Sequence, residues 1–218
     1  MLSHTEENYL KALFHLTVER EGKMEAGTNE LAAALNVKPA TANDMLKRLK
    51  EKGLADYEKY GKISLTASGR KQAVEVVRKH RLWETFLFEK LAFTWDEVHE
   101  VAEQLEHIQS PKLIEKLDQF LEYPQFDPHG DAIPNARGEW ETPERKLLSE
   151  APVSKVCKLV AVRDSSPAFL KYVDQTGLKL GSKIKVVSRM EFDGTMELEI
   201  NKMRVTVSEK FAAHIFVV

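Results

Sequence analysis

Histidine and glutamate side chains recur at helical spacing in two segments of the chain. His80 and Glu84 stand four residues apart in KHRLWE, which places them one turn apart on one helix face. The later segment HEVAEQLEH carries four such side chains within an arc of roughly 100° on one helix: His99, Glu103, Glu106 and His107. Carboxylates that face one another repel unless a cation lies between them. The spacing therefore predicts a metal site.

The chemistry of these groups narrows the choice of metal. The two stripes offer carboxylate oxygen and imidazole nitrogen, with no sulfur ligand among them. That set suits Mn²⁺ or Fe²⁺, while Zn²⁺, Co²⁺ and Ni²⁺ can compete for it. The remaining histidines are interpreted as ordinary surface or core groups: His4, His15, His129 and His214.

Two alternatives use the same residues differently. The stripes could be solvated helix faces without a metal, or a carboxylate-rich site could activate water or oxygen on a helical scaffold. The stripes contain no paired Glu-x-x-His motif, and HExxH, the nucleophile elbow, the P-loop and the dinucleotide fingerprint are also missing from the sequence. No enzymatic activity is expected.

The elements before residue 66 suggest a winged helix-turn-helix. Helices are expected over 8–18, 28–35 and 39–52, followed by a hairpin over 54–66 with its tip at Tyr60-Gly61. In this order the helix over 39–52 can enter the major groove of DNA while the hairpin lies along phosphates. Between Lys38 and Lys62 there are seven basic and four acidic residues, a net charge of +3. Such a patch favours a polyanion.

Candidate DNA contacts follow from this arrangement. The start of the helix over 39–52 is expected to reach base edges, through Lys38, Pro39, Thr41 and Asn43. Later residues of that helix and the hairpin are better placed for phosphates: Lys47, Arg48, Lys59, Tyr60 and Lys62.

The rest of the chain divides at its prolines. Five of the eight lie within 29 residues, between Pro124 and Pro152, which predicts an irregular stretch. Helices are expected from about 67 past 84 and over 95–108, and short β-rich runs follow residue 153. We therefore expect a mainly α chain with a small β-barrel domain. The predicted divisions are 1–66, 67–140, a linker over 141–152, and 153–218.

The amino-acid composition excludes several classes of protein. With 43% hydrophobic and 30% charged residues among 218, the chain is expected to be globular. A single cysteine excludes an internal disulfide framework. Neither a signal peptide nor an apolar run of transmembrane length is visible, so a cytoplasmic protein without a membrane partner is expected.

Three motifs carry a resemblance that extends over essentially the whole chain: KHRLWE (79–84), HEVAEQLEH (99–107) and DPHGDAIP (127–134). Their joint occurrence resembles the metal-dependent transcriptional repressors of the diphtheria toxin repressor (DtxR) family, nearest the manganese-sensing, MntR/ScaR-like branch. The resemblance implies an N-terminal domain that binds operator DNA and middle helices that dimerise and hold metal. It also implies that the C-terminal domain is SH3-like (FeoA-like).

The resemblance further implies two metal sites. One would use His80, Glu84 and His99, with Asp164 as the candidate from the C-terminal domain. The second would use Glu103, Glu106 and His107 with Asn8 from the first helix, where manganese sensors carry Asp and iron sensors Met; neighbouring Glu7 is the alternative ligand. Glu103 stands where iron sensors carry Cys, which points away from iron. Lys11 stands where some manganese sensors carry a second Glu, so their binuclear arrangement is not expected.

These inferences predict a homodimeric repressor that binds double-stranded operator DNA when Mn²⁺, or alternatively Fe²⁺, is plentiful, and that controls metal-uptake genes. The alternative is a metal-independent winged-helix regulator, whose DNA affinity would not respond to a chelator. A helical metalloenzyme is the third reading.

Overall fold

The computed structural model describes residues 2–19, 24–57 and 61–218. The chain forms two compact units: the first holds residues 1–80, 104–115 and 134–139, and the second holds 81–103, 116–133 and 140–218. The division falls inside one continuous helix, α4 (Ala67–Leu91).

Helix α1 (His4–Thr17) supplies much of the core of the first unit. It begins with a capping box, in which the Glu6 backbone N–H donates to Ser3 Oγ and the Ser3 N–H donates to the Glu6 carboxylate. Leu10, Leu13 and Phe14 are fully buried. The prediction of a helix over 8–18 is correct, and the cap places its start four residues earlier.

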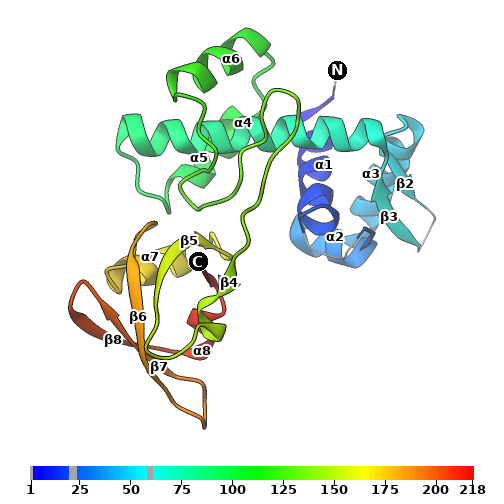
Figure 1. Ribbon diagram of the computed structural model, residues 1–218. Coiled ribbons are helices and arrows are strands. Elements are labelled where there is room, and N and C mark those ends of the chain that lie inside the picture. The colour runs from blue at the N-terminus through cyan, green and yellow to red at the C-terminus, as the bar shows by residue number, and fades with distance from the viewer. Residues whose placement is uncertain (1, 20–23, 58–60) are drawn as a thin grey trace. The chain divides into compact units, whose positions relative to one another are not determined.

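The winged helix-turn-helix is confirmed (Figure 1). It comprises α2 (Thr28–Ala34), α3 (Pro39–Glu51) and the hairpin of β2 (Ala55–Tyr57) and β3 (Lys62–Leu65). A short strand that was not predicted, β1 (Ala26–Gly27), pairs with the other side of β3, giving the order β1-β3-β2. Leu31, Leu46 and Ile63 are fully buried and fix the three parts to one another.

The middle helices differ in part from the expectation. Helix α4 begins at Ala67 and runs past Glu84 as predicted, and it ends at Leu91 after 25 residues. The next helix, α5 (Val98–Leu105), is shorter than the expected 95–108, because Thr94 donates its backbone N–H to Glu97 Oε2 in a turn before it. Helix α6 (Pro111–Phe120) was not predicted.

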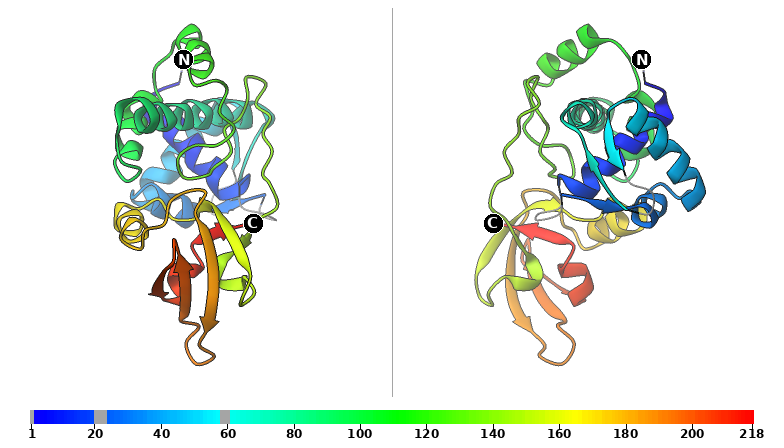
Figure 2. Two further views of the ribbon diagram at one scale, coloured as in Figure 1. Left: turned by 60° about the vertical axis from the view of Figure 1, so that its left-hand side comes forward. Right: turned by 90° about the vertical axis from the view of Figure 1, so that its right-hand side faces the viewer.

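The second unit contains a six-stranded antiparallel sheet in the order β4-β9-β5-β6-β7-β8. The strands are β4 (Lys146–Leu147), β5 (Val156–Val162), β6 (Lys183–Arg189), β7 (Met196–Ile200), β8 (Met203–Val207) and β9 (Ile215–Val217). Five of these match the predicted β-rich runs. Two helices accompany the sheet, α7 (Pro167–Gln175) and α8 (Glu209–Ala212), and α8 lies beside the strands in both views of Figure 2. The expected fold class, with a small SH3-like β-domain, is confirmed.

The sheet begins earlier than the expected domain start at 153. Strand β4 pairs with β9, and the 3-10 helix η1 (Leu148–Glu150) follows it. Leu148 is fully buried in the core of the sheet, so this part of the expected linker over 141–152 packs as part of the second unit. No helix among the described residues has the length and apolar character needed to cross a membrane.

Candidate metal centre

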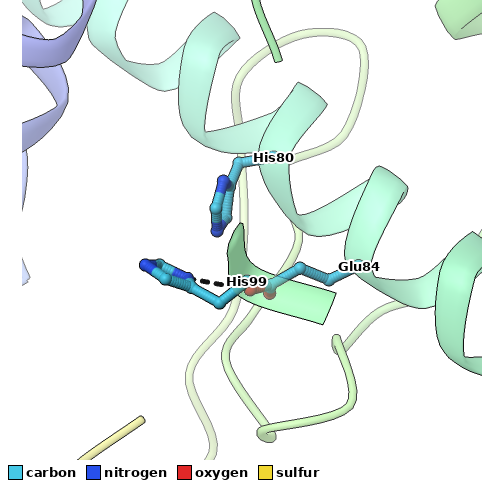
Figure 3. A group of neighbouring side chains, drawn as sticks. All are labelled: His80, Glu84 and His99. Atoms are coloured by element: carbon cyan, nitrogen blue, oxygen red, sulfur yellow. Dashed lines mark hydrogen bonds and ion pairs between the residues drawn. The ribbon is translucent and has the colours of Figure 1, made fainter. Parts of the chain in front are cut away.

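Glu84 on α4 lies at the centre of a group of metal-binding side chains. One ligand atom from each of His80, Glu84 and His99 lies within 4.8 Å of the others (Figure 3). His80 and Glu84 come from successive turns of α4, while His99 stands on α5 and places Nδ1 3.1 Å from Glu84 Oε1. Glu84 is 2% exposed. A carboxylate buried this deeply needs cationic or hydrogen-bonding partners.

A second group shares the same carboxylate. Ligand atoms of Glu84, Asp127 and His129 also lie within 4.8 Å of one another, and all three residues are buried. The sequence interpretation assigned His129 an ordinary role and did not consider Asp127. The available signal was the DPHG motif itself, which places an acid and an imidazole two residues apart.

A tight turn positions Asp127 and His129. Asp127 Oδ1 accepts the backbone N–H groups of His129 and Asp131, at 2.8 and 3.0 Å. Gly130 has φ +87°, and a Cβ there would lie 2.1 Å from the carbonyl oxygen of Val160. Only glycine therefore allows the turn to approach the sheet this closely.

Hydrogen bonds orient the His129 ring. The Nε2 atom lies 2.8 Å from the carbonyl oxygen of Trp95, to which it donates, and Nδ1 lies 3.5 Å from Glu84 Oε2. A metal-ligating histidine commonly donates its other ring N–H to a backbone carbonyl, which fixes the tautomer. The Nδ1 atom is therefore the one directed at the centre.

Charge is concentrated around Glu84. Hydrogen bonds that the His99 ring donates to the Glu103 and Glu84 carboxylates raise the pKa of His99 to about 9. Burial alone would lower the pKa of His129, but the hydrogen bond and charge of Glu84 outweigh it and raise that pKa to about 9. Burial, and then the negative charges of Asp131 and Glu84, raise the pKa of Asp127 to about 7. Without an added cation, protons carry the balancing positive charge.

The second predicted ligand set is centred on Glu106. Glu106 is fully buried, and its Oε2 atom accepts hydrogen bonds from Lys11 Nζ at 2.8 Å and from His80 Nδ1 at 2.5 Å. The Glu103 side chain is 52% exposed and lies 3.5 Å from His99 Nε2. The predicted role of Glu103 as a ligand beside Glu106 and His107 stays a prediction.

Two oxygen atoms of the Glu106 set suit a cation. Glu106 Oε1 and Asn8 Oδ1 are both buried and have no hydrogen-bond partner among the residues that the structure describes. His107 Nε2 lies 3.8 Å from Glu106 Oε1, while its Nδ1 lies 2.5 Å from Glu7 Oε2. Buried oxygens without partners are costly. Glu106 Oε1 and His107 Nε2 are therefore close enough to share a cation, while Glu7 holds the other ring nitrogen of His107. The role of Asn8 as a further ligand stays a prediction.

Asp164, the ligand predicted from the C-terminal domain, lies in the loop between β5 and α7. Its Oδ1 atom accepts the Ser166 backbone N–H at 2.8 Å. Its role as a ligand stays a prediction.

The predicted DNA contacts lie mainly on the exposed start of α3. Lys38, Pro39 and Thr41 are exposed. Asn43 is half-buried, donates to the Pro39 carbonyl at 3.0 Å and accepts from the Tyr57 hydroxyl. Both ends of its amide are thus engaged in joining α3 to β2.

The phosphate candidates are distributed along α3 and the hairpin. Lys47 pairs with Asp44 at 2.9 Å, and Arg48 is exposed. Lys62 pairs with Glu25 at 2.7 Å. Lys59 and Tyr60 lie outside the described residues.

Known proteins resemble this chain along most of its length. Three family models match in succession: "Iron dependent repressor, N-terminal DNA binding domain" over residues 1–63, "Iron dependent repressor, metal binding and dimerisation domain" over 66–135, and "FeoA domain" over 146–218. A solved structure titled as a manganese-dependent transcriptional repressor in complex with manganese is 36% identical. That likeness covers 98% of this chain and 99% of the other, with a TM-score of 0.87.

The chain belongs to the DtxR family. Like the other members of this family it is a metal-dependent, DNA-binding transcriptional repressor. Two further relatives support this family assignment. The iron-dependent repressor IdeR of Mycobacterium leprae (strain TN) is 27% identical over 217 residues, which covers all of this chain and 89% of the relative. The manganese regulator SloR is 32% identical, with a TM-score of 0.77 and coverage of 98% and 97%.

Proposed function

We propose that this repressor responds to Mn²⁺ and binds operator DNA of metal-uptake genes as a homodimer. The observation that carries the proposal is the buried Glu84 carboxylate, which two groups of imidazoles and carboxylates share. Such a concentration of ligand atoms inside a DNA-binding regulator is best explained by a divalent cation.

The proposed ligands form two sets. The first is built on Glu84 with His80 and His99, with support from the Asp127–His129 turn and from Glu103. The second is built on Asn8, Glu106 and His107. Asp164 remains a further candidate. A bound cation would neutralise the carboxylates and supply a coordination bond that joins α1 to the residues after α5.

Manganese is preferred because of the donor atoms. Both sets contain imidazole nitrogen with carboxylate or amide oxygen, and neither contains sulfur. Oxygen-rich sets suit Mn²⁺, and Fe²⁺ is the alternative. Zn²⁺, Co²⁺ and Ni²⁺ are expected to substitute in vitro because raw affinity follows a different order.

Gating follows from how the ligands attach to the DNA-binding part. Asn8 lies on α1, whose Leu10, Leu13 and Phe14 belong to the core that also supports α3. Ligation of Asn8 together with Glu106 would therefore hold the DNA-binding elements in one position. In a dimer, this fixes the separation of two α3 helices against half-sites about one helical turn apart.

A binding experiment with a matched pair of variants tests the proposal. Operator affinity is measured at fixed salt in EDTA and in Mn²⁺ for the wild type, for Glu84→Gln and for Glu89→Gln, which is exposed on the same helix. Mn²⁺ should tighten wild-type and Glu89→Gln binding strongly. Glu84→Gln should lose about 100-fold or more in metal affinity. It should also lose most of the gain in operator affinity that Mn²⁺ gives the wild type. Equal operator affinity in EDTA and Mn²⁺ would instead favour the metal-independent regulator.

A further inference from the structure

A buried lysine joins α1 to the segment that follows α5. Lys11 is 8% exposed, and its Nζ atom lies 2.8 Å from Oε2 of Glu106, a carboxylate 95 positions later that is fully buried. Lysine is almost never buried without a partner. The contact is therefore a specific connection between α1 and Glu106.

A second contact reinforces the same connection. Glu7 lies one turn before Lys11 on α1, and its two oxygens reach His107 Nδ1 at 2.5 Å and Gln109 Nε2 at 2.7 Å. Two successive turns of α1 thus hold residues 106–109 through charged groups of the chain itself. The connection that a divalent cation is proposed to make already exists in protein contacts.

The ammonium group and a cation use different atoms of Glu106. Oε2 is engaged by Lys11 and by His80 Nδ1, whereas Oε1 has no hydrogen-bond partner among the described residues. Lys11 therefore leaves the second ligand set intact. It contributes one positive charge permanently, at the carboxylate where a metal contributes charge only when it is bound.

The cost of the pair indicates that it serves more than stability. Removing an ammonium and a carboxylate from water is expensive, and apolar side chains of similar volume often replace such pairs without loss of stability. What the pair provides is a fixed geometry between Lys11 on α1, Glu106 and His80 on α4.

We propose that Lys11 is a positioning residue: a built-in cation that keeps α1 attached to Glu106 when no metal is bound and so gives the repressor a basal affinity for DNA. This rests on the proposed metal-gated function. Metal would then strengthen an existing connection rather than create it, and the ratio of DNA affinity with and without metal would be smaller than in a variant that lacks the lysine charge.

Hydrogen exchange tests the anchor without DNA. Amide exchange of residues 4–17 and 99–110 is followed in EDTA and in Mn²⁺ for the wild type, Lys11→Met and Lys52→Met. Lys52 is the matched control, since it also pairs with α1, through Glu6 at 2.7 Å, but away from Glu106. In EDTA, Lys11→Met should exchange at least tenfold faster in these segments, and Mn²⁺ should restore most of the protection. Lys52→Met should resemble the wild type.

Operator binding tests the consequence. In EDTA, Lys11→Met should bind DNA at least tenfold more weakly than the wild type, with less than a threefold difference in saturating Mn²⁺. Unchanged exchange and unchanged EDTA affinity in Lys11→Met would overturn the proposal. A wild type whose DNA binding ignores Mn²⁺ would refute the gated function instead, while the exchange result would still decide the role of Lys11.

A double variant controls for the possibility that Lys11→Met fails to fold. Lys11→Met alone leaves the Glu106 charge buried, so the double variant Lys11→Met/Glu106→Gln removes both charges. It should fold, as checked by circular dichroism, and should show fast exchange in EDTA that Mn²⁺ no longer slows. Wild-type protection of the double variant in EDTA would contradict the anchor. Lys11→Arg keeps the charge and should retain protection.

Discussion

At the scale of single residues, the centre is controlled by competition between protons and a cation for the same groups. His99 and His129 flank Glu84 from α5 and from the DPHG turn, and the negative charges around them hold both pKa values near 9. At neutral pH both rings are therefore positively charged, with a proton on each of their two nitrogens. An imidazole must lose that proton at the ligating nitrogen before it can bind a metal.

This competition predicts that Mn²⁺ affinity rises with pH. Because the two pKa values are raised, proton loss is costly at pH 6.5 and free of cost above about pH 9. If both rings ligate, affinity should increase by at most about two decades per pH unit in this window and then level off. Titrations with Mn²⁺ followed by electron paramagnetic resonance measure it. His129→Gln should halve the slope, and His214→Gln should not change it; a slope of zero would exclude both rings as ligands.

At the scale of elements, α3 and β2 are joined by a contact that changes the expected role of Asn43. The Tyr57 hydroxyl, on a side chain that is 5% exposed, donates to the Asn43 side chain. The Lys50 ammonium also donates to the Tyr57 carbonyl, at 2.7 Å. Asn43 is thus a brace within the DNA-binding part, whereas the exposed Thr41 is able to reach a base edge.

Two alanine variants separate these roles. Asn43→Ala leaves the buried Tyr57 hydroxyl without its acceptor and should lower the free energy of unfolding by about 1–3 kcal/mol. Thr41→Ala should change it by less than about 0.5 kcal/mol while weakening operator binding by about 1–3 kcal/mol. Urea unfolding and operator titrations measure both. Full stability of Asn43→Ala with altered base preference would restore Asn43 as a base contact.

Elements with strong local signals could be predicted from the sequence. Helix α1 follows from the helical spacing of its apolar residues. Helix α3 and the hairpin follow from their glycine and charge pattern, and β5 to β9 follow from the alternation of apolar and polar residues. The helices α6 and α7 were missed although Pro111 and Pro167 stand at their first positions. Proline is over-represented at the first position of a helix, and this signal was not used at Pro111 and Pro167.

Spacing along the chain could group the candidate site residues only where they share a helix, and the resemblance was needed to bring His99 to His80 and Glu84. His80 and Glu84 follow from spacing along α4. The DPHG motif marks Asp127 and His129 as possible ligands, but their approach to Glu84 depends on Gly130 fitting against the backbone of β5, a long-range contact that the motif does not encode. The end of α5 was also not predicted: the expected helix over 95–108 ends at Leu105, so Glu106 and His107 lie beyond it.

At the scale of the whole molecule, charge is distributed unevenly. Residues 82–151 contain 16 acidic and 6 basic residues, a net charge of −10, although the whole chain carries only −2. The segment from Lys38 to Lys62 carries +3. Acidity in the middle of the chain thus offsets the basic DNA-binding elements, which limits the sequence-independent attraction to DNA. In the proposed homodimer, specific binding would then depend on two correctly spaced copies of α3.

The proposed homodimer requires a contact between its two protomers. The second unit carries exposed apolar side chains suited to such a contact. Phe88 and Leu91 at the end of α4, Phe120 at the end of α6 and the following Tyr123 are 44% to 65% exposed. These side chains are the candidates for the dimer contact, since they lie within residues 66–135, which match a family model described as a metal binding and dimerisation domain.

Phe120→Asp should therefore shift the protein from dimer to monomer, because it places a charge in the proposed apolar contact. Light scattering after gel filtration measures the mass, and operator binding in saturating Mn²⁺ should weaken by more than about tenfold because one half-site is lost. Phe192→Asp is the control: Phe192 is 97% exposed in the loop between β6 and β7, and its charge should change neither mass nor affinity. A dimeric Phe120→Asp with full operator affinity would place the contact between protomers elsewhere on the chain.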